Sequence, residues 1–114
     1  MKSKPRASTA SRARSAKYLR GLGDPTRLTV LELLAENGEM NVSQLVEAIG
    51  VPQGRLSDHL ACLKWCHYVE SRREGKYVYY VIKDERVLAL LSLIQELASD
   101  HADDLDACLR IPDA

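Results

Sequence analysis

The chain has 114 residues, of which 46% are hydrophobic and 28% are charged, and its 16 basic residues balance 16 acidic ones. This length suffices for one domain and is too short for two independent ones. No apolar stretch approaches the roughly 20 residues of a membrane span, and the basic N-terminus lacks the apolar segment of a secretory signal. We therefore expect a soluble cytoplasmic protein, whose odd number of cysteines favours metal or redox chemistry over a disulfide framework.

The neutral total conceals a gradient of charge along the chain. Residues 1–20 carry seven basic residues and no acidic ones, whereas residues 84–114 carry eight acidic residues and two basic ones. We expect a flexible basic arm over residues 1–16, a folded domain over 17–100 and an acidic tail over 101–114. The arm indicates a polyanionic partner, although a merely solvated tail would have the same composition.

Helix signals dominate the first part of the chain and predict helices over residues 8–21, 24–37, 43–50 and 53–66. The second of these begins at an Asp-Pro pair, which combines an N-cap acceptor with a proline at the first helical position, and it stops at Asn-Gly. The last two are joined by a tight link that contains glycine, which predicts a helix-turn-helix.

The period of the pattern changes after residue 67. Residues 68–73 and 77–82 are rich in β-branched and aromatic residues and flank a turn at Glu74–Lys76, which predicts a β-hairpin. Asp84 then caps a last helix with an apolar stripe. Its members follow one another at helical spacing: Val87, Leu90, Leu91, Ile94, Leu97 and Ala98. The stripe favours pairing with a second chain, and the alternative is that it covers only the core of its own chain.

A mainly α fold in which a helix-turn-helix precedes a small β-hairpin is a winged helix. The second helix of the motif enters the major groove of double-stranded DNA, and the hairpin contacts the backbone. Glutamine suits adenine and arginine suits guanine, while basic residues of a hairpin suit phosphates. The candidate DNA contacts are Gln53, Arg55, Ser57, Asp58 and His59 on the helix, and Arg72, Arg73 and Lys76 on the hairpin. Taken singly, each could equally be an ordinary solvated side chain.

The sequence resembles the ArsR/SmtB family of bacterial metal-responsive repressors over about residues 17–98. The motifs that carry the resemblance are DPTR at 24–27, SDHL at 57–60 and REGKYVYY at 73–80. The resemblance implies a winged-helix homodimer whose first and last helices form the interface. It also implies that the apo dimer binds an inverted-repeat operator and releases it when an inducer binds.

The metal-binding motifs that are present or absent narrow the range of metal ions that could act as the inducer. Asn41–Ser43 lacks the C-x-C motif of one branch, and Asp84–Arg86 lacks the histidine with which another branch begins its zinc site. Cys62 and Cys66 with Cys108 instead resemble the cadmium- and lead-sensing (CmtR-like) branch. That resemblance implies that two cysteines of the reading helix bind the metal together with one from the partner chain's tail.

The spacing of Cys62 and Cys66 supports a metal site independently. Residues four apart on a helix have Cβ atoms about 5–6 Å apart, which is too far for an easy disulfide at ~3.8 Å. Two thiolates can span that gap through one ion at ~2.3 Å from each, by analogy with zinc. Three thiolates would form a soft site for Cd(II), Pb(II), Hg(II) or As(III).

Two alternatives to a metal site remain open for these thiols. Cys62 and Cys66 could be small buried hydrophobic residues, the commonest role of a free cysteine. The protein could also be a thiol-redox repressor, in which Cys108 forms a disulfide with Cys62 or Cys66. His59 could add a fourth ligand, but we expect it to serve the DNA face or a local hydrogen bond.

Other features of the sequence depart from the family pattern or exclude other functions. Pro52 occupies the position of the usual Ser or Thr cap, and Gly54 costs about 1 kcal/mol relative to alanine, so both weaken the start of the reading helix. The cluster of His101 with Asp103, Asp104 and Asp106 could bind a hard ion, but we interpret it as a solvated acidic end. The sequence lacks HExxH, GxSxG and P-loop motifs, which argues against an enzyme.

Overall fold

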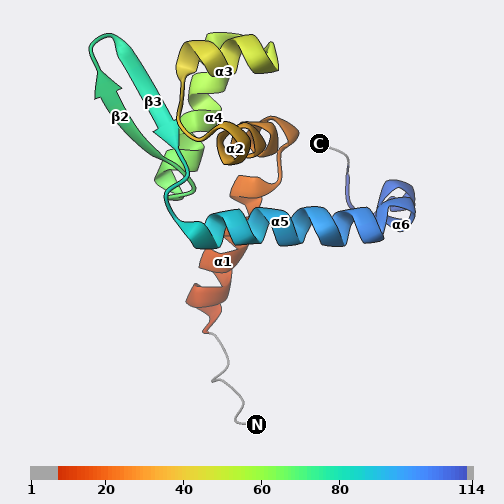
Figure 1. Cartoon of the computed structure of the whole chain (residues 1–114). Helices are drawn as coiled ribbons and strands as arrows, with labels where there is room; N and C mark the ends of the chain where they lie inside the picture. The colour runs from red at the N-terminus through yellow and green to blue at the C-terminus, as the bar shows by residue number, and fades with distance from the viewer. Residues whose placement is uncertain (1–7, 113–114) are drawn as a thin grey trace.

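The computed structural model describes residues 8–112, which form six helices and three short strands (Figure 1). In chain order these are α1 (Thr9–Leu22), α2 (Pro25–Asn37), β1 (Met40–Asn41), α3 (Val42–Ile49), α4 (Gln53–Trp65), β2 (Glu70–Glu74), β3 (Tyr77–Val81), α5 (Glu85–Asp100) and α6 (Ala102–Ala107). Within this part of the chain no helix is both long and apolar enough to cross a membrane. Every helix predicted from the sequence is present.

The starts of α2, α3 and α5 follow from capping side chains. Asp24 accepts a hydrogen bond from the backbone N–H of Arg27 at 3.0 Å, and Asn41 forms a reciprocal capping box with Gln44. Asp84 accepts from Arg86 at the start of α5. Helix α4 is different, because its N-cap is Pro52, whose ring offers no acceptor oxygen. The weakly capped start predicted for α4 is therefore confirmed.

The β-hairpin is formed by β2 and β3, which pair antiparallel with Glu74 opposite Tyr77. Gly75, at φ 61°, occupies the left-handed region in the turn, where a residue without Cβ is unstrained. Strand β1 pairs with the other edge of β3, so the sheet order is β1-β3-β2. The sequence did not predict β1, because a two-residue strand has no detectable alternation.

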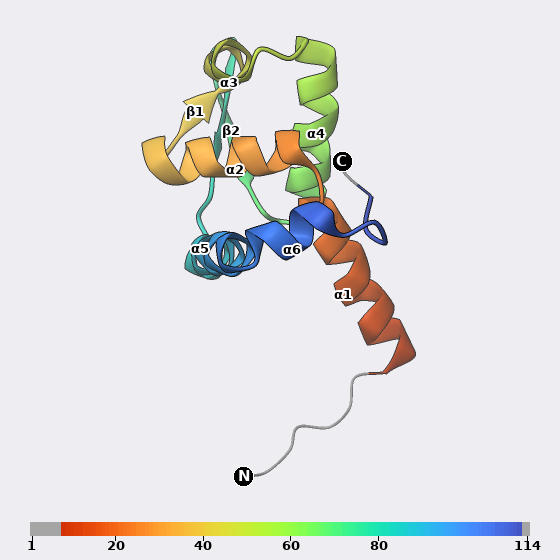
Figure 2. The same ribbon diagram turned by 90° about the vertical axis from the view of Figure 1, so that its right-hand side faces the viewer.

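The core lies between α2, α3, α4 and the root of the hairpin, and it is built largely from leucine. Leu56, Leu60 and Leu63 of α4 are fully buried, as their spacing predicted. Helix α5 crosses α2 and is followed by α6 at its far end (Figure 1 and Figure 2). Val87 of α5 is buried in the core, whereas Leu93 and Leu97 remain about half exposed in the single chain.

The predicted basic arm lies partly outside the described residues. Residues 1–7 are not described, whereas Thr9–Ala16 form the first half of α1, in agreement with the helix predicted from residue 8. The acidic tail contains α6, which the sequence analysis did not predict. This helix is six residues long, and three of its residues are acidic.

Candidate metal centre and nucleic-acid interface

Cys62 and Cys66 lie together on one flank of the last two turns of α4. Both are half-buried free thiols, and they lie four residues apart, which places them on the same side of the helix. The leucine face of α4 points into the core, so the two thiols lie to one side of it. The structure therefore places two of the three predicted metal ligands side by side on α4.

The C-terminal end of helix α1 packs closely against Cys66 at Gly21. A Cβ atom built on Gly21 would lie 3.3 Å from Cys66 Sγ and 3.3 Å from Cε2 of Tyr68. Tyr68 is fully buried, stacks on Tyr18 and donates its hydroxyl to the backbone oxygen of Tyr18 at 2.7 Å. The end of α4 is therefore joined to the end of α1 by close packing beside the thiol pair.

The environment of Cys66 favours the neutral thiol over the thiolate. Burial raises the pKa of Cys66, and the neighbouring Cys62 thiol raises it further, whereas Arg27 and Lys17 lower it. Because a metal binds the thiolate, binding must displace a proton from this site near neutral pH. The two cations offset part of that cost.

Cys108 lies far from the other two thiols in the single chain. Cys66 lines a pocket with Asp84 and Val87 at the N-terminal end of α5, whereas Cys108 directly follows α6, which lies at the other end of α5 and after which the chain turns back toward α2 (Figure 1). The 16 residues of α5 span about 24 Å. Among residues 8–112, no three His, Cys, Asp or Glu side chains are grouped closely enough to hold a metal, and the acidic end at 101–106 is exposed.

Arg27 is the residue of this region that the sequence analysis missed. Its Nε donates to the backbone oxygen of Gly21 at 2.7 Å, and its Nη2 donates to that of Arg20 at 3.2 Å. Its Nη1 lies 3.4 Å from Nδ1 of His59, which is also 3.8 Å from the Asp24 carboxylate. Arg27 thus connects the end of α1 with α4, one turn before Cys62. Its place three residues after the N-cap was a signal that could have indicated an inward-facing position.

The N-terminal half of α4 presents polar side chains to solvent. Gln53, Arg55, Ser57 and Asp58 are all exposed there. His59 differs, since it is half buried and turned toward Asp24 and Arg27. It therefore makes the local hydrogen bond that the sequence analysis considered beside a DNA contact.

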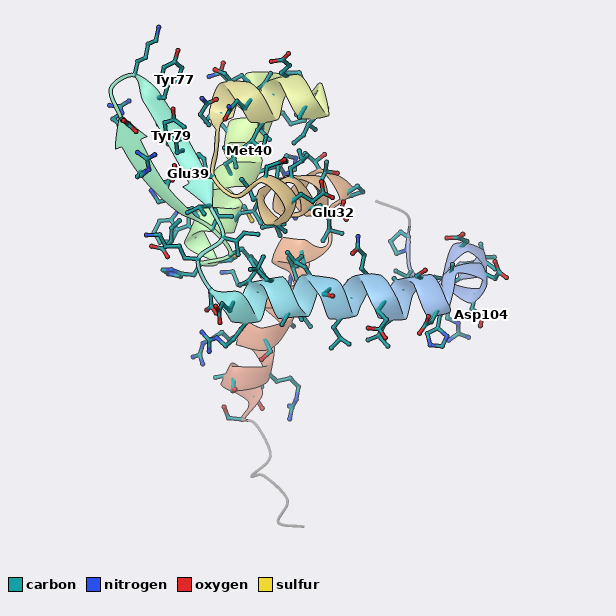
Figure 3. The ribbon with its side chains drawn as sticks, viewed as in Figure 1. Glu32, Glu39, Met40, Tyr77, Tyr79 and Asp104 are labelled. Carbon is teal, nitrogen blue, oxygen red and sulfur yellow. The ribbon has the colours of Figure 1, made fainter. Side chains whose placement is uncertain are left out.

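The three basic residues of the hairpin have different environments. The guanidinium of Arg72 contacts Glu39 through Nε at 2.8 Å, contacts Glu74 as well, and lies 4.6 Å from the centre of the Tyr79 ring. Figure 3 shows Glu39 beside Tyr79 at the hairpin. The paired arginine lowers the pKa of Glu39. Arg73 and Lys76 are exposed nearer the tip, so Arg72 is the least available of the three for a phosphate.

Comparisons with known proteins place this arrangement in a family. The family described as "Bacterial regulatory protein, arsR family" matches residues 24–71, from the N-cap of α2 into β2. A probable mercury resistance operon repressor of Streptomyces lividans is 45% identical over 86% of this chain and 78% of its own length. The chain belongs to the arsR family.

Two further matches agree with that assignment. The regulator CmtR of Mycobacterium bovis is 34% identical over 77% of this arsR-family chain and 75% of its own length. The homodimeric winged helix-turn-helix DNA-binding domain of Mb0332 from the same species superposes with a TM-score of 0.76. It is 35% identical and covers 89% of this chain and 93% of its own. The resemblance and the winged-helix fold predicted from the sequence are confirmed, and these relatives are regulators rather than enzymes.

Proposed function

We propose that this arsR-family chain is a homodimeric repressor that releases its operator when a soft heavy-metal ion binds Cys62, Cys66 and Cys108. The observation that carries the proposal is the pair of half-buried thiols on one side of α4. The same helix presents exposed polar side chains at its other end. A metal that repositions the thiol end of α4 therefore acts on the element that would read DNA.

An exposed apolar surface supports the dimer. Tyr18 and Leu19 of α1 are exposed, as are Leu93 and Leu97 of α5, and Tyr18 lines a pocket with Leu90 of α5. A two-fold dimer buries the same surface on both chains. The homodimeric relative makes pairing through α1 and α5 the simplest way to cover this surface.

Such a dimer also explains how Cys108 could reach the thiol pair. If the two α5 helices pack antiparallel, the far end of one lies beside the near end of the other, where Cys66 lies. Within one chain, α6 spans only about 9 Å and cannot bring Cys108 back along the ~24 Å of α5. We therefore assign Cys108 of each site to the partner chain.

The donor set indicates the class of inducer. Three thiolates form a soft site, which favours Cd(II), Pb(II), Hg(II) or As(III) over hard cations such as Mg(II). The similarity to a mercury resistance repressor supports a heavy metal in general. The DNA contacts that we propose are Gln53, Arg55, Ser57 and Asp58 of α4 and Arg73 and Lys76 of the hairpin, with smaller roles for His59 and Arg72.

The experiment uses mixed dimers on DNA from upstream of the protein's own gene. Cys62→Ser, Cys66→Ser and Cys108→Ser homodimers should each retain operator binding in a gel shift and fail to release DNA with Cd(II). Refolding Cys62→Ser together with Cys108→Ser should rebuild one complete site per mixed dimer. The ultraviolet thiolate-to-Cd(II) band per dimer should return to about half of the wild-type intensity.

Two results would contradict the proposal. Release of DNA by Cd(II) from any one of the three single variants would remove that cysteine from the sensing site. Absence of recovery in verified mixed dimers would exclude a site shared between two chains. A thiol titration after mild oxidation separates the redox alternative, which predicts release together with the loss of two thiols and without metal.

A further inference from the structure

A solvent-exposed tryptophan, Trp65, lies next to Cys66 in the sequence, at the end of α4. Trp65 ends α4 and is 85% exposed, although tryptophan is the largest apolar side chain and here the only one of its kind in the chain. With Ala61, Lys64 and His67 it lines a shallow, mostly apolar pocket. Trp65 follows Cys62 by three residues on α4, so the two side chains lie about 60° apart around the helix axis. Trp65 therefore flanks Cys62 on the solvent side.

The C-terminal tail carries a matching set of uncovered apolar side chains. Leu109 is 97% exposed and Ile111 is 65% exposed, directly after Cys108. Cys108 itself has extended backbone, with φ −72° and ψ 115°. Both the tail and the Trp65 pocket therefore present apolar surface next to a predicted metal ligand.

We infer that the Trp65 pocket is the docking site for Leu109 and Ile111 of a second copy of this chain, and that it positions that copy's Cys108. The inference rests on the proposed function and adds to it a residue that does not touch the metal. Trp65 would act through Cys108 and is thus a positioning residue.

The closeness of these residues in sequence supports this assignment. Leu109 and Ile111 follow Cys108 within three residues, and the chain bends over residues 109–111. A tail that brings Cys108 to Cys62 and Cys66 therefore also brings these apolar side chains to the end of α4 that carries Trp65.

Charge favours the same approach of the tail. Asp103, Asp104 and Asp106 precede Cys108, whereas Lys64 borders the pocket and Lys17 lies close enough to Cys66 to lower the pKa of its thiol. An acidic segment from a second copy meets Lys64 and Lys17 at this site, although Asp84 and Glu70 share a neighbouring pocket with Lys64 and offset part of this attraction. Within one chain, α5 separates α6 and Cys108 from the end of α4 that carries Cys66, which disfavours docking of the tail onto its own chain.

The experiment uses the intrinsic fluorescence of Trp65 in the full-length dimer, titrated with Cd(II). In the wild type, Cd(II) should shift the emission to shorter wavelength and reduce quenching by acrylamide. Leu109→Ser combined with Ile111→Ser should abolish both changes. In a protein that is otherwise wild type, Trp65→Ala should weaken Cd(II) binding by about tenfold or more. In a protein that also carries Cys108→Ser, Trp65→Ala should leave the Cd(II) affinity unchanged. Tyr77→Ala, an exposed aromatic residue on the hairpin, is the matched control and should have no effect on Cd(II) affinity.

Mixed dimers identify which chain supplies the tail. One protomer keeps Trp65 and carries Leu109→Ser with Ile111→Ser, and the other carries Trp65→Phe with an intact tail. Protection of the single tryptophan by Cd(II) supports docking of the partner's tail, whereas its absence in verified mixed dimers overturns it.

The same samples separate this inference from the proposed function. If the thiolate-to-Cd(II) band exceeds that of Cys108→Ser while Trp65 stays accessible to acrylamide, the docking site is refuted and the three-thiolate site stands. If the two bands are equal, Cys108 is no ligand, and both the third ligand and the docking site are refuted. Protection of Trp65 by Cd(II) in Cys108→Ser would show that something other than the positioned tail covers it, which also overturns the inference.

Discussion

Replacement of Arg27 tests whether the thiol pair is coupled to α1 through this one side chain. Arg27→Met keeps the length and apolar stem of the side chain but removes its charge and all of its donors. Arg27→Lys keeps the charge but loses the planar fork that reaches two carbonyl groups and His59. The two variants therefore separate the hydrogen bonds of Arg27 from its electrostatic effect on Cys66.

The loss of stability follows from the hydrogen bonds. A bond from a charged donor contributes about 1.5–3 kcal/mol, and the half-buried contact with Gly21 at 2.7 Å is of this kind. The bond to Arg20 is exposed and 3.2 Å long, so it adds little. We expect Arg27→Met to lower the free energy of unfolding by about 2–3 kcal/mol and Arg27→Lys by about 1–2 kcal/mol, as measured by urea denaturation.

The effect on Cys66 distinguishes the two variants. Arg27 lowers the pKa of the Cys66 thiol, so Arg27→Met should raise that pKa and Arg27→Lys should leave it nearly unchanged. Thiolate absorbance measured in a Cys62→Ser, Cys108→Ser background reports Cys66 alone. In the protein with all three cysteines, Arg27→Met should bind Cd(II) more weakly than the wild type near neutral pH. This difference in affinity should vanish at pH values above the pKa of the Cys66 thiol. Equal Cys66 pKa values in both variants, or a methionine variant as stable as the wild type, would refute this reasoning.

Three further predictions concern α4 and the hairpin. Arg73→Ala should reduce the magnitude of the slope of log operator affinity against log salt concentration by about 0.9. Arg72→Ala should change this slope less, because Glu39 and Glu74 already neutralise Arg72. Salt titrations of DNA binding measure both slopes. Gly54→Ala should stabilise the apo protein by up to about 1 kcal/mol, since a Cβ there meets open space and α4 gains helix propensity; thermal unfolding checks it, and a lower Tm would contradict it. His67→Gly should stabilise by about 1 kcal/mol, because His67 terminates α4 at φ 62°, where a side chain is strained; an unchanged Tm would show that its contacts offset the strain.

The main elements were predictable because each rests on a local signal. Asp24 and Asp84 are strong N-cap residues, and the leucines of α4 recur at helical spacing, so sequence alone located these helices to within a residue or two. Strand β1 and helix α6 lack such signals. The first depends on pairing with β3, which lies about 40 residues later, and the second consists mainly of acidic and small residues.

The contacts around the thiols were less predictable, because they join residues that are distant in sequence. The spacing of Cys62 and Cys66 placed them on one face of a helix, and the structure confirms that both lie at the end of α4, to one side of its buried leucines. The pairing of Arg72 with Glu39 and of Arg27 with His59 spans more than 30 residues in each case. No periodicity encodes such pairs, so Arg72 and His59 were assigned to DNA with no knowledge of these partners.

In a single chain, α5 separates Cys108 from the thiol pair. The distance of Cys108 from Cys66 in the single chain is set by α5, which is straight and continuous from Glu85 to Asp100 and cannot shorten without unfolding (Figure 1). A third thiolate from this position is therefore compatible with the fold only if a second chain supplies it, and α5 would have to pack against its copy in the antiparallel sense. Helix α5, which separates Cys108 from the thiol pair of its own chain, would then bring Cys108 close to the thiol pair of the partner chain. A parallel arrangement of α5 in the dimer would break this relation, so measuring the relative direction of the two α5 helices, by disulfide cross-linking of Leu93→Cys and Leu97→Cys variants, tests the shared site without any metal.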